Sequence, residues 1–267
     1  MGAKVLTLTF LLFVTSACVV SKTAEISKIV LLAPFEGQYR EIGYDALYSA
    51  RLALSEQNLV AIDLLAIDDG GSNDLAQTRI EAINQDASVI AVIALGQFAT
   101  SAGAQSALHD VPMIIVGNWG DSDVTENVYR LSHSDVDNYI NFRGDLDDLA
   151  FSSDSIIGGE ILSLYQTPIV FDYTNNIEIY SSSSLSDEAF RQRYLDSADF
   201  TPEPNLLATL TYDATNLILT SIATNTPISE IDYEGINGLI RFQNGYWLNA
   251  PLHRYQYQDD TLVEISN

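Results

Sequence analysis

The sequence predicts an α/β protein built on a doubly wound parallel sheet. Four short apolar runs in the first half are typical of strands that are buried on both faces. A segment with apolar residues at helical spacing follows each of the first three runs. Strands that alternate with amphipathic helices indicate parallel βαβ units, with helices on both faces of the sheet. The four strands are expected at residues 29–33, 60–67, 89–94 and 113–116.

Three helices are expected between these strands. The first covers residues 43–57, where Ala46, Leu47, Ala50, Ala53 and Leu54 share one face. The second begins at Asn73 or Asp74, since either side chain can cap a helix, and its inner face carries Ala76, Ile80 and Ile83. The third is expected at residues 99–108.

The second half of the chain is less regular. Residues 129–184 show one clear helical pattern, and the C-terminal part returns to helices and then to strands around the turn Asn244–Gly245. Ser186 or Asp187 is expected to cap the helix that follows. The expected elements are a helix at 135–150, strands at 169–171 and 177–180, helices at 188–197 and 205–222, and strands at 239–242, 252–258 and 261–265.

The N-terminus predicts export from the cell. Lys4 precedes a ten-residue apolar run at 5–14, and small residues follow at 15–17. Such a run is too short to span a bilayer, which needs about 20 residues, so residues 1–17 are interpreted as a cleaved signal peptide. Cys18 follows directly and is the only cysteine of the chain. This arrangement resembles the bacterial lipobox, with Thr15 in place of the usual Leu. Cys18 is therefore expected to be lipidated, and ordinary cleavage without acylation is the alternative.

The composition excludes several classes of partner. The formal net charge is −24, so nucleic acids and anionic lipid headgroups would repel the chain. Because 47% of the residues are hydrophobic and 10% aromatic, the chain is nevertheless expected to fold. The three histidines lie far apart and lack the spacing of metal ligands, and the acidic run at 68–74 lacks the pattern of a calcium loop. No catalytic residue, metal or cofactor is predicted, so the chain is not expected to be an enzyme.

Several segments, in order along the chain, resemble the branched-chain amino acid (leucine-binding-type) periplasmic binding proteins, which have the type 1 solute-binding fold. The opening resemblance combines the strand and Pro-x-x-Gly turn at 29–39 with Ile42–Gly43 and residues 50–53. The other matching segments are residues 68–73, 91–107, 111–115, 188–194, 212–215 and 238–245.

The resemblance implies two α/β lobes, of which the second is shortened here. A βαβ unit takes about 30 residues, so the 56 residues from Tyr129 to Ser184 hold fewer than two units. Residues 18–28 are expected to form a lipid-anchored tether. The main, complete lobe is assigned to residues 29–128 and 185–251, and the truncated second lobe with its connections to residues 129–184 and 252–267.

Candidate ligand-binding residues lie in the loops that follow the first four strands, because open parallel sheets bind ligands beyond the carboxyl ends of their strands. The resemblance implies that the third and fourth loops hold an amino acid carboxylate through hydroxyl and N–H groups. Trp119 is expected either to stack on a ligand or to fill space left by the shortened lobe. The candidates are Glu36, Tyr39, Gln97, Phe98, Thr100, Ser101, Asn118 and Trp119.

The leading functional hypothesis is a solute-binding lipoprotein at the outer face of the cell membrane or in the periplasm. It would capture an amino acid or similar small solute for an ABC permease. The alternative hypothesis is a divergent binding-protein relic that serves as a sensor or interaction module. The relic predicts a narrow cleft, or one filled by Trp119 and tyrosine side chains.

Overall fold

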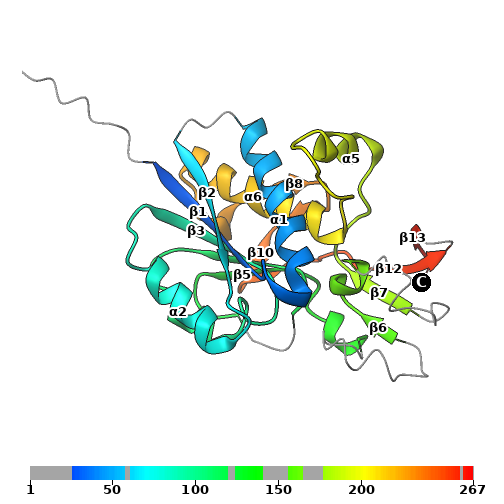
Figure 1. The fold of residues 1–267 in the computed structure, drawn as a ribbon, viewed down its shortest axis with the longest axis horizontal. Coiled ribbons are helices and arrows are strands. Elements are labelled where there is room, and N and C mark those ends of the chain that lie inside the picture. The colour runs from blue at the N-terminus through cyan, green and yellow to red at the C-terminus, as the bar shows by residue number, and fades with distance from the viewer. Residues whose placement is uncertain are drawn as a thin grey trace, which may run out of the picture.

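The structure is a computed structural model that describes residues 26–57, 61–119, 124–140, 156–164, 177–258 and 261–266. Its large sheet has seven strands in the order β10-β11-β5-β4-β3-β1-β2 (Figure 1). The five strands at the β2 end of this order are parallel, so the predicted doubly wound parallel sheet is confirmed. They are β1 (Ser27–Ala33), β2 (Ile62–Asp68), β3 (Val89–Ala94), β4 (Met113–Val116) and β5 (Val128–Leu131).

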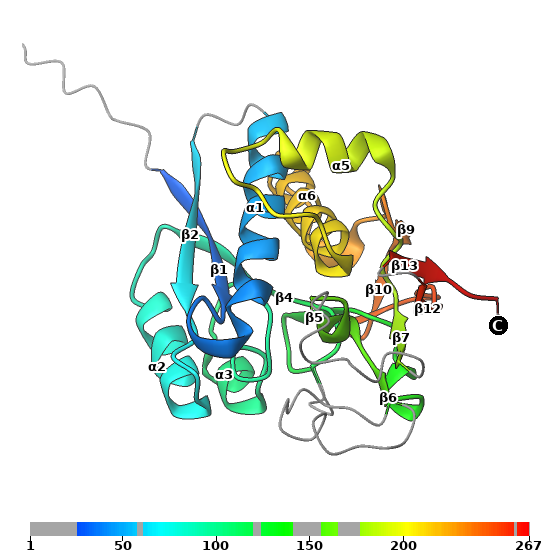
Figure 2. The same ribbon diagram turned by 45° about the vertical axis from the view of Figure 1, so that its right-hand side comes forward.

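Helices cover both faces of this sheet (Figure 2). Alternate residues of β1 point to opposite faces: Ile29 and Leu31 belong to one apolar cluster, and Val30 and Leu32 to the other. Because both faces are covered there, β1 is apolar without interruption from Ile29 to Ala33, as the sequence predicted. The covering helices are α1 (Arg40–Glu56) and α6 (Leu206–Thr224) on one face, and α2 (Asn73–Ile83) and α3 (Ala102–Ala107) on the other.

The starts of all three early helices differ from the prediction. The second helix is capped by Ser72, whose Oγ accepts the N–H of Leu75 at 3.3 Å, so capping by Asn73 or Asp74 was wrong. The first begins at Arg40 rather than Gly43, directly after a 3₁₀ turn, η1 (Gly37–Tyr39). The third begins at Ala102 because the Oγ of Ser101 accepts the N–H of Ala104.

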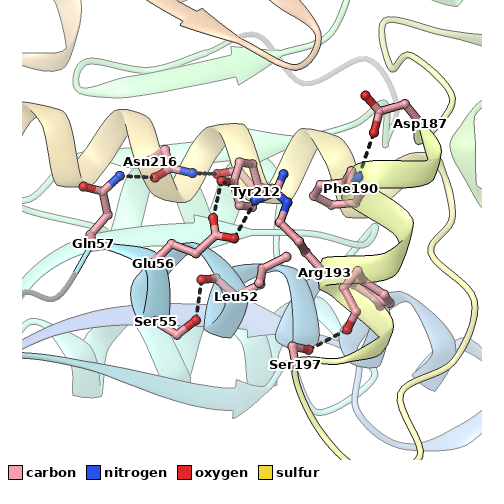
Figure 3. Close-up of polar contacts among 11 residues, drawn as sticks. Leu52, Ser55, Glu56, Gln57, Asp187, Phe190, Arg193, Ser197, Tyr212 and Asn216 are labelled. Atoms are coloured by element: carbon pink, nitrogen blue, oxygen red, sulfur yellow. Dashed lines mark hydrogen bonds and ion pairs between the residues drawn. The ribbon is translucent and has the colours of Figure 1, made fainter.

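Three helices from distant parts of the chain meet on one side of the molecule (Figure 3). Asp187 caps α5 (Glu188–Leu195) by accepting the N–H of Phe190, and it is one of the two residues predicted as the cap. Arg193 of α5 pairs with Glu56 of α1, and its guanidinium lies 5.7 Å from the ring centroids of both Phe190 and Tyr212. The Tyr212 hydroxyl of α6 also donates to Glu56. These contacts join α5 and α6 to α1.

The start of α6 is capped from another helix. Asn205 makes no side-chain cap, and instead its backbone N–H donates to the Asp45 carboxylate of α1 at 3.2 Å. The hydroxyl of Tyr194 donates to the same oxygen at 3.1 Å. An oxygen that accepts an N–H at a helix N-terminus is what a helix cap supplies, so Asp45 replaces the missing local cap.

A second sheet of four strands has the order β13-β12-β7-β6. Strands β6 and β7 are parallel, and the other pairs are antiparallel. The helical pattern at 135–150 appears in the described residues only as a 3₁₀ turn, η2 (Val136–Asn138), and the strand expected at 169–171 lies outside them. The sequence analysis did not predict β6. The strands are β6 (Ile156–Gly158), β7 (Ile177–Ser181), β12 (His253–Gln258) and β13 (Thr261–Glu264).

The C-terminal strands pair differently from the prediction. Asn244 and Gly245 have φ values of 52° and 81°, and they close a tight hairpin between β10 (Phe242–Gln243) and β11 (Tyr246–Trp247). The sequence placed strands 239–242 and 252–258 on the two sides of this turn; the strand that directly follows the turn is β11 instead, and β12 pairs with β7 and β13. A separate hairpin joins β8 (Tyr233–Gly235) to β9 (Gly238–Ile240), after a 3₁₀ turn, η5 (Ile228–Glu230).

The large sheet also extends past residue 128, the predicted end of the first segment of the main lobe. Strand β5 pairs with β4 through Leu131, so the sheet continues three residues beyond the predicted boundary at residue 128. Within the described residues, none of the helices is both long and apolar enough to cross a membrane.

Gly43 is a close contact between α1 and the end of β1. A Cβ built there would lie 2.3 Å from the Pro34 carbonyl oxygen and 2.8 Å from the Phe35 ring. We expect Gly43→Ala to lower the free energy of unfolding by about 1–3 kcal/mol, because the backbone must move to relieve the overlap. Urea denaturation measures this loss.

The matched control is Gly103→Ala in α3, where the new Cβ meets the flexible end of Gln77 at 3.3 Å. That change is expected to be neutral or to stabilise by up to about 1 kcal/mol, since alanine is a better helix former than glycine. Equal stability of the two variants would contradict the predicted close contact.

Candidate ligand-binding site

A cavity of about 660 Å³ opens at the carboxyl ends of β1, β2, β3 and β4. The chain passes from β1 to β2 on one side and then to β3 on the other, so the strand order reverses between β1 and β3. Loops diverge at such a switch point and leave a crevice, which is where open α/β sheets bind ligands. The cavity volume is within the range of small-molecule sites. It is lined by Pro34, Glu36, Gly37, Gln38, Tyr39, Ile42, Asp68, Asp69, Gly70, Gly71, Arg79, Gly96, Gln97, Phe98, Trp119 and Ile161.

Five of the eight predicted site residues line this cavity: Glu36, Tyr39, Gln97, Phe98 and Trp119. They come from the loops after β1, β3 and β4, which the strand order brings together. The cavity therefore has aromatic walls on several sides and a carboxylate at one edge.

The other three predicted residues, Thr100, Ser101 and Asn118, do not line the cavity. The hydroxyl of Thr100 donates to the carbonyl of Gly96 at 2.9 Å, and the hydroxyl oxygen of Ser101 caps α3. The backbone N–H of Asn118 donates to Glu160 at 3.0 Å. The groups expected to hold a ligand carboxylate are thus engaged within the protein.

Two aspartates in the loop after β2 organise the cavity floor. Asp68 accepts the N–H of Phe35 at 2.7 Å and that of Gly70 at 2.9 Å, which ties the loops after β1 and β2 together. Asp69 is 1% exposed and accepts the N–H of Gly71 at 2.9 Å. Burial raises the pKa of Asp69 above its ordinary value. The sequence analysis interpreted this loop as a turn and helix cap, and only its position after a strand pointed to the site.

The Trp119 side chain packs against the protein core and also lines the cavity. Its indole N–H donates to the carbonyl of Val116 at 2.6 Å, which fixes the ring orientation. The ring packs against the apolar clusters on both faces of the sheet and also borders the cavity. The two roles that the sequence left open are therefore compatible.

One wall of the cavity comes from the segment that follows β6. Ile161 of η3 (Glu160–Leu164) lines the cavity beside Trp119. Its neighbour Glu160 is 1% exposed and accepts the N–H of Asn118 and, at 2.8 Å, the hydroxyl of Ser181 at the end of β7. Burial raises the pKa of Glu160.

Glu160 therefore joins the end of β4 in the large sheet to the end of β7 in the small one. Glu160 was not among the predicted site residues, because β6, the strand before it, was not predicted from the sequence.

The charges around the cavity are predominantly negative. Glu36, Asp68 and Asp69 face one guanidinium, that of Arg79 on α2. Arg79 and Asp68 also border a separate hollow between β2 and α2. Within the described residues no group of three or more His, Cys, Asp or Glu side chains is placed to hold a metal ion.

No protein-family model matches this sequence, and no curated protein sequence matches it. Solved structures match strongly in three dimensions. A leucine-binding protein of Thermotoga maritima aligns over 90% of this chain and 98% of its own, with a TM-score of 0.68 and 12% identity. A branched-chain amino acid substrate-binding protein of Streptococcus pneumoniae, in complex with isoleucine, aligns over 90% and 100%, with a TM-score of 0.64 and 14% identity.

A third structure is an ABC-transporter solute-binding protein of R. palustris in complex with benzoate. It aligns over 90% of this chain and 95% of its own, with a TM-score of 0.64 and 12% identity. All three are binding proteins. At these identities the likeness establishes the fold: the chain has the type 1 periplasmic-binding-protein fold, with a second sheet consistent with a shortened lobe. The resemblance seen in the sequence is confirmed at that level.

Proposed function

From the type 1 binding-protein fold of this chain, we propose that it is an extracytoplasmic solute-binding protein that captures an amino acid or a similar small solute for an ABC permease. The observation that carries the proposal is the cavity of about 660 Å³ at the sheet switch point, walled by aromatic and charged side chains. A relic without ligand binding would have this space filled, and Trp119 borders the cavity without filling it.

The two sheets are proposed to act as two lobes. In this proposal the large sheet supplies the floor and most of the walls, and Ile161 beside the small sheet supplies the closing wall. Ligands of two-lobed proteins are enclosed when one lobe closes on the other. No catalytic role is proposed for any residue of the cavity.

Ligand binding is expected to raise the melting temperature. A solute at 100 times its dissociation constant stabilises the folded state by about 2.7 kcal/mol. For a chain of this size that gain corresponds to a shift of about 5–10 °C. Thermal denaturation of the purified protein with pools of amino acids, short peptides and aromatic acids measures it. No shift with any pool at millimolar concentration would favour the relic.

The proposed anchor is a lipid on Cys18, which lies outside the described residues. Cys18→Ser is expected to abolish incorporation of labelled fatty acid and to move the protein from the membrane fraction to the soluble exported fraction, because no thiol remains for acylation. Fractionation of cells that express each form, with immunoblotting, checks this outcome. An unlabelled native protein in the soluble fraction would show that the signal is simply cleaved.

A further inference from the structure

Several hydrogen-bond donors at the strand ends beside the cavity are used inside the protein. In the loops after β1 and β2, the N–H groups of Phe35, Gly70 and Gly71 donate to Asp68 and Asp69. A ligand carboxylate needs convergent donors of this kind, and these are taken by side chains that themselves carry carboxylates.

The loops after β3 and β4 are used in the same way. The hydroxyl of Thr100, the backbone N–H of Asn118 and the indole N–H of Trp119 all donate to protein oxygens. Among the described residues that line the cavity, Arg79 on α2 is the one cation, and three carboxylates, those of Glu36, Asp68 and Asp69, line it as well. An anionic ligand would therefore meet more negative than positive charge among these residues.

The groups that line the cavity suit a cation. Glu36 is exposed at the cavity edge, and the rings of Tyr39, Phe98 and Trp119 form its walls. Aromatic faces attract cations within about 6 Å, and a carboxylate completes the recognition of an ammonium group.

Asp69 adds to this preference from below the floor. Asp69 is 1% exposed, and its Oδ2 has no partner at hydrogen-bonding distance among the described residues. The backbone N–H of Ala99 nevertheless favours the charged form of the carboxyl group and lowers its pKa. A Cβ at Gly96 in the cavity floor would lie 3.7 Å from this oxygen. When this carboxylate is charged it repels an anion above it and attracts a cation, and a bound cation in turn favours the charged form over the neutral form that burial favours.

We propose that the cavity selects organic amines without a carboxylate, that is, cations with an aliphatic or aromatic body, over the corresponding amino acids. This inference rests on the proposed solute-binding function and names the class of solute. The carboxyl group of an amino acid would lose hydration on entering the cavity, and it would face the carboxylates of Glu36, Asp68 and Asp69 against one described guanidinium, that of Arg79.

Isothermal titration of the purified protein with matched pairs tests the proposal. Each pair is an amino acid and its decarboxylated amine: leucine with isopentylamine, lysine with cadaverine, arginine with agmatine, and tyrosine with tyramine. We expect the amine of the preferred pair to bind at least about tenfold more tightly than its parent amino acid. The reason is that the amine lacks the carboxylate that the cavity would have to desolvate.

Equal or tighter binding of the amino acid would overturn this inference and would leave the proposed function standing. If neither these compounds nor the wider solute pools bind, the proposed function fails and this inference fails with it.

Two variants separate the contributions of charge. Glu36→Gln is expected to weaken amine binding about tenfold, because it removes the exposed carboxylate. Arg79→Gln is expected to tighten amine binding a few-fold, because it removes from the cavity lining a positive charge that repels the positively charged amine. Circular dichroism confirms that each variant is folded. Loss of ligand binding in Arg79→Gln would show that the ligand is held through a carboxylate, and would contradict the proposal.

Discussion

Glu160→Ala is expected to lower the free energy of unfolding by about 3–5 kcal/mol. The carboxylate accepts the N–H of Asn118 and the hydroxyl of Ser181, and all three residues are buried. Removing it leaves two buried donors without an acceptor, at about 1–3 kcal/mol each, and opens a void beside Ile161. Because Ile161 lines the cavity, the same variant is expected to weaken ligand binding. Urea denaturation and ligand titration measure the two effects.

Glu160→Gln tests whether hydrogen bonding is the cause. The amide retains one acceptor oxygen and the size of the side chain, so it should restore about half of the lost stability. Glu230→Ala, an exposed glutamate on η5, provides the matched control and should change stability by less than about 0.5 kcal/mol. A Glu160→Ala protein as stable as this control would show that the connection between the two sheets is dispensable.

Stability is expected to fall as the pH rises from about 4 to 7. Burial raises the pKa of Asp45 to about 7 and that of Asp213 to about 6, both from 3.8. A carboxyl group with a raised pKa binds its proton more tightly in the folded state than in the unfolded state. The contribution to stability is therefore complete below pH 4 and is lost as the pH rises through the folded-state pKa. For Asp45 the loss between pH 5 and pH 7 is about 2 kcal/mol.

Asp45→Asn should reduce this pH dependence. The amide oxygen can still accept the N–H of Asn205 and the hydroxyl of Tyr194, and the side chain no longer titrates. Melting temperatures at pH 5 and pH 7 should then lie closer together than in the native protein. Glu230→Gln changes the net charge equally and should leave the native difference in place. A native protein that is more stable at pH 7 than at pH 5 would contradict the prediction.

The local pattern of residues was sufficient for the large sheet. Strands β1, β3 and β4 were predicted because strands covered by helices on both faces form short continuous apolar runs, as Ile29 to Ala33 show. The start of α6 after Asn205 was also predicted from sequence. The small sheet was predicted only in part, because β6 has three residues and pairs with β7, which begins almost twenty residues later.

The predicted site residues likewise divide into those that the sequence placed correctly at the cavity and those that it did not. Glu36, Tyr39, Gln97, Phe98 and Trp119 follow strands directly, so the general rule for open sheets was enough to bring them to the cavity. Thr100, Ser101 and Asn118 also follow strands, and no rule of sequence told which direction their polar groups would point. Their hydrogen bonds to Gly96, Ala104 and Glu160 decide that they face the protein.

The sequence by itself therefore determined the fold class and the edge of the sheet that carries the cavity, since both follow from apolar patterns within short segments. Only the tertiary structure decided which groups are available to a ligand. Glu160 meets Asn118 across 42 residues of chain, and Asp68 takes the N–H of Phe35 across 33. Burial and hydrogen bonding depend on such distant partners, and among the described residues they leave a cavity lined by more carboxylates than cationic side chains.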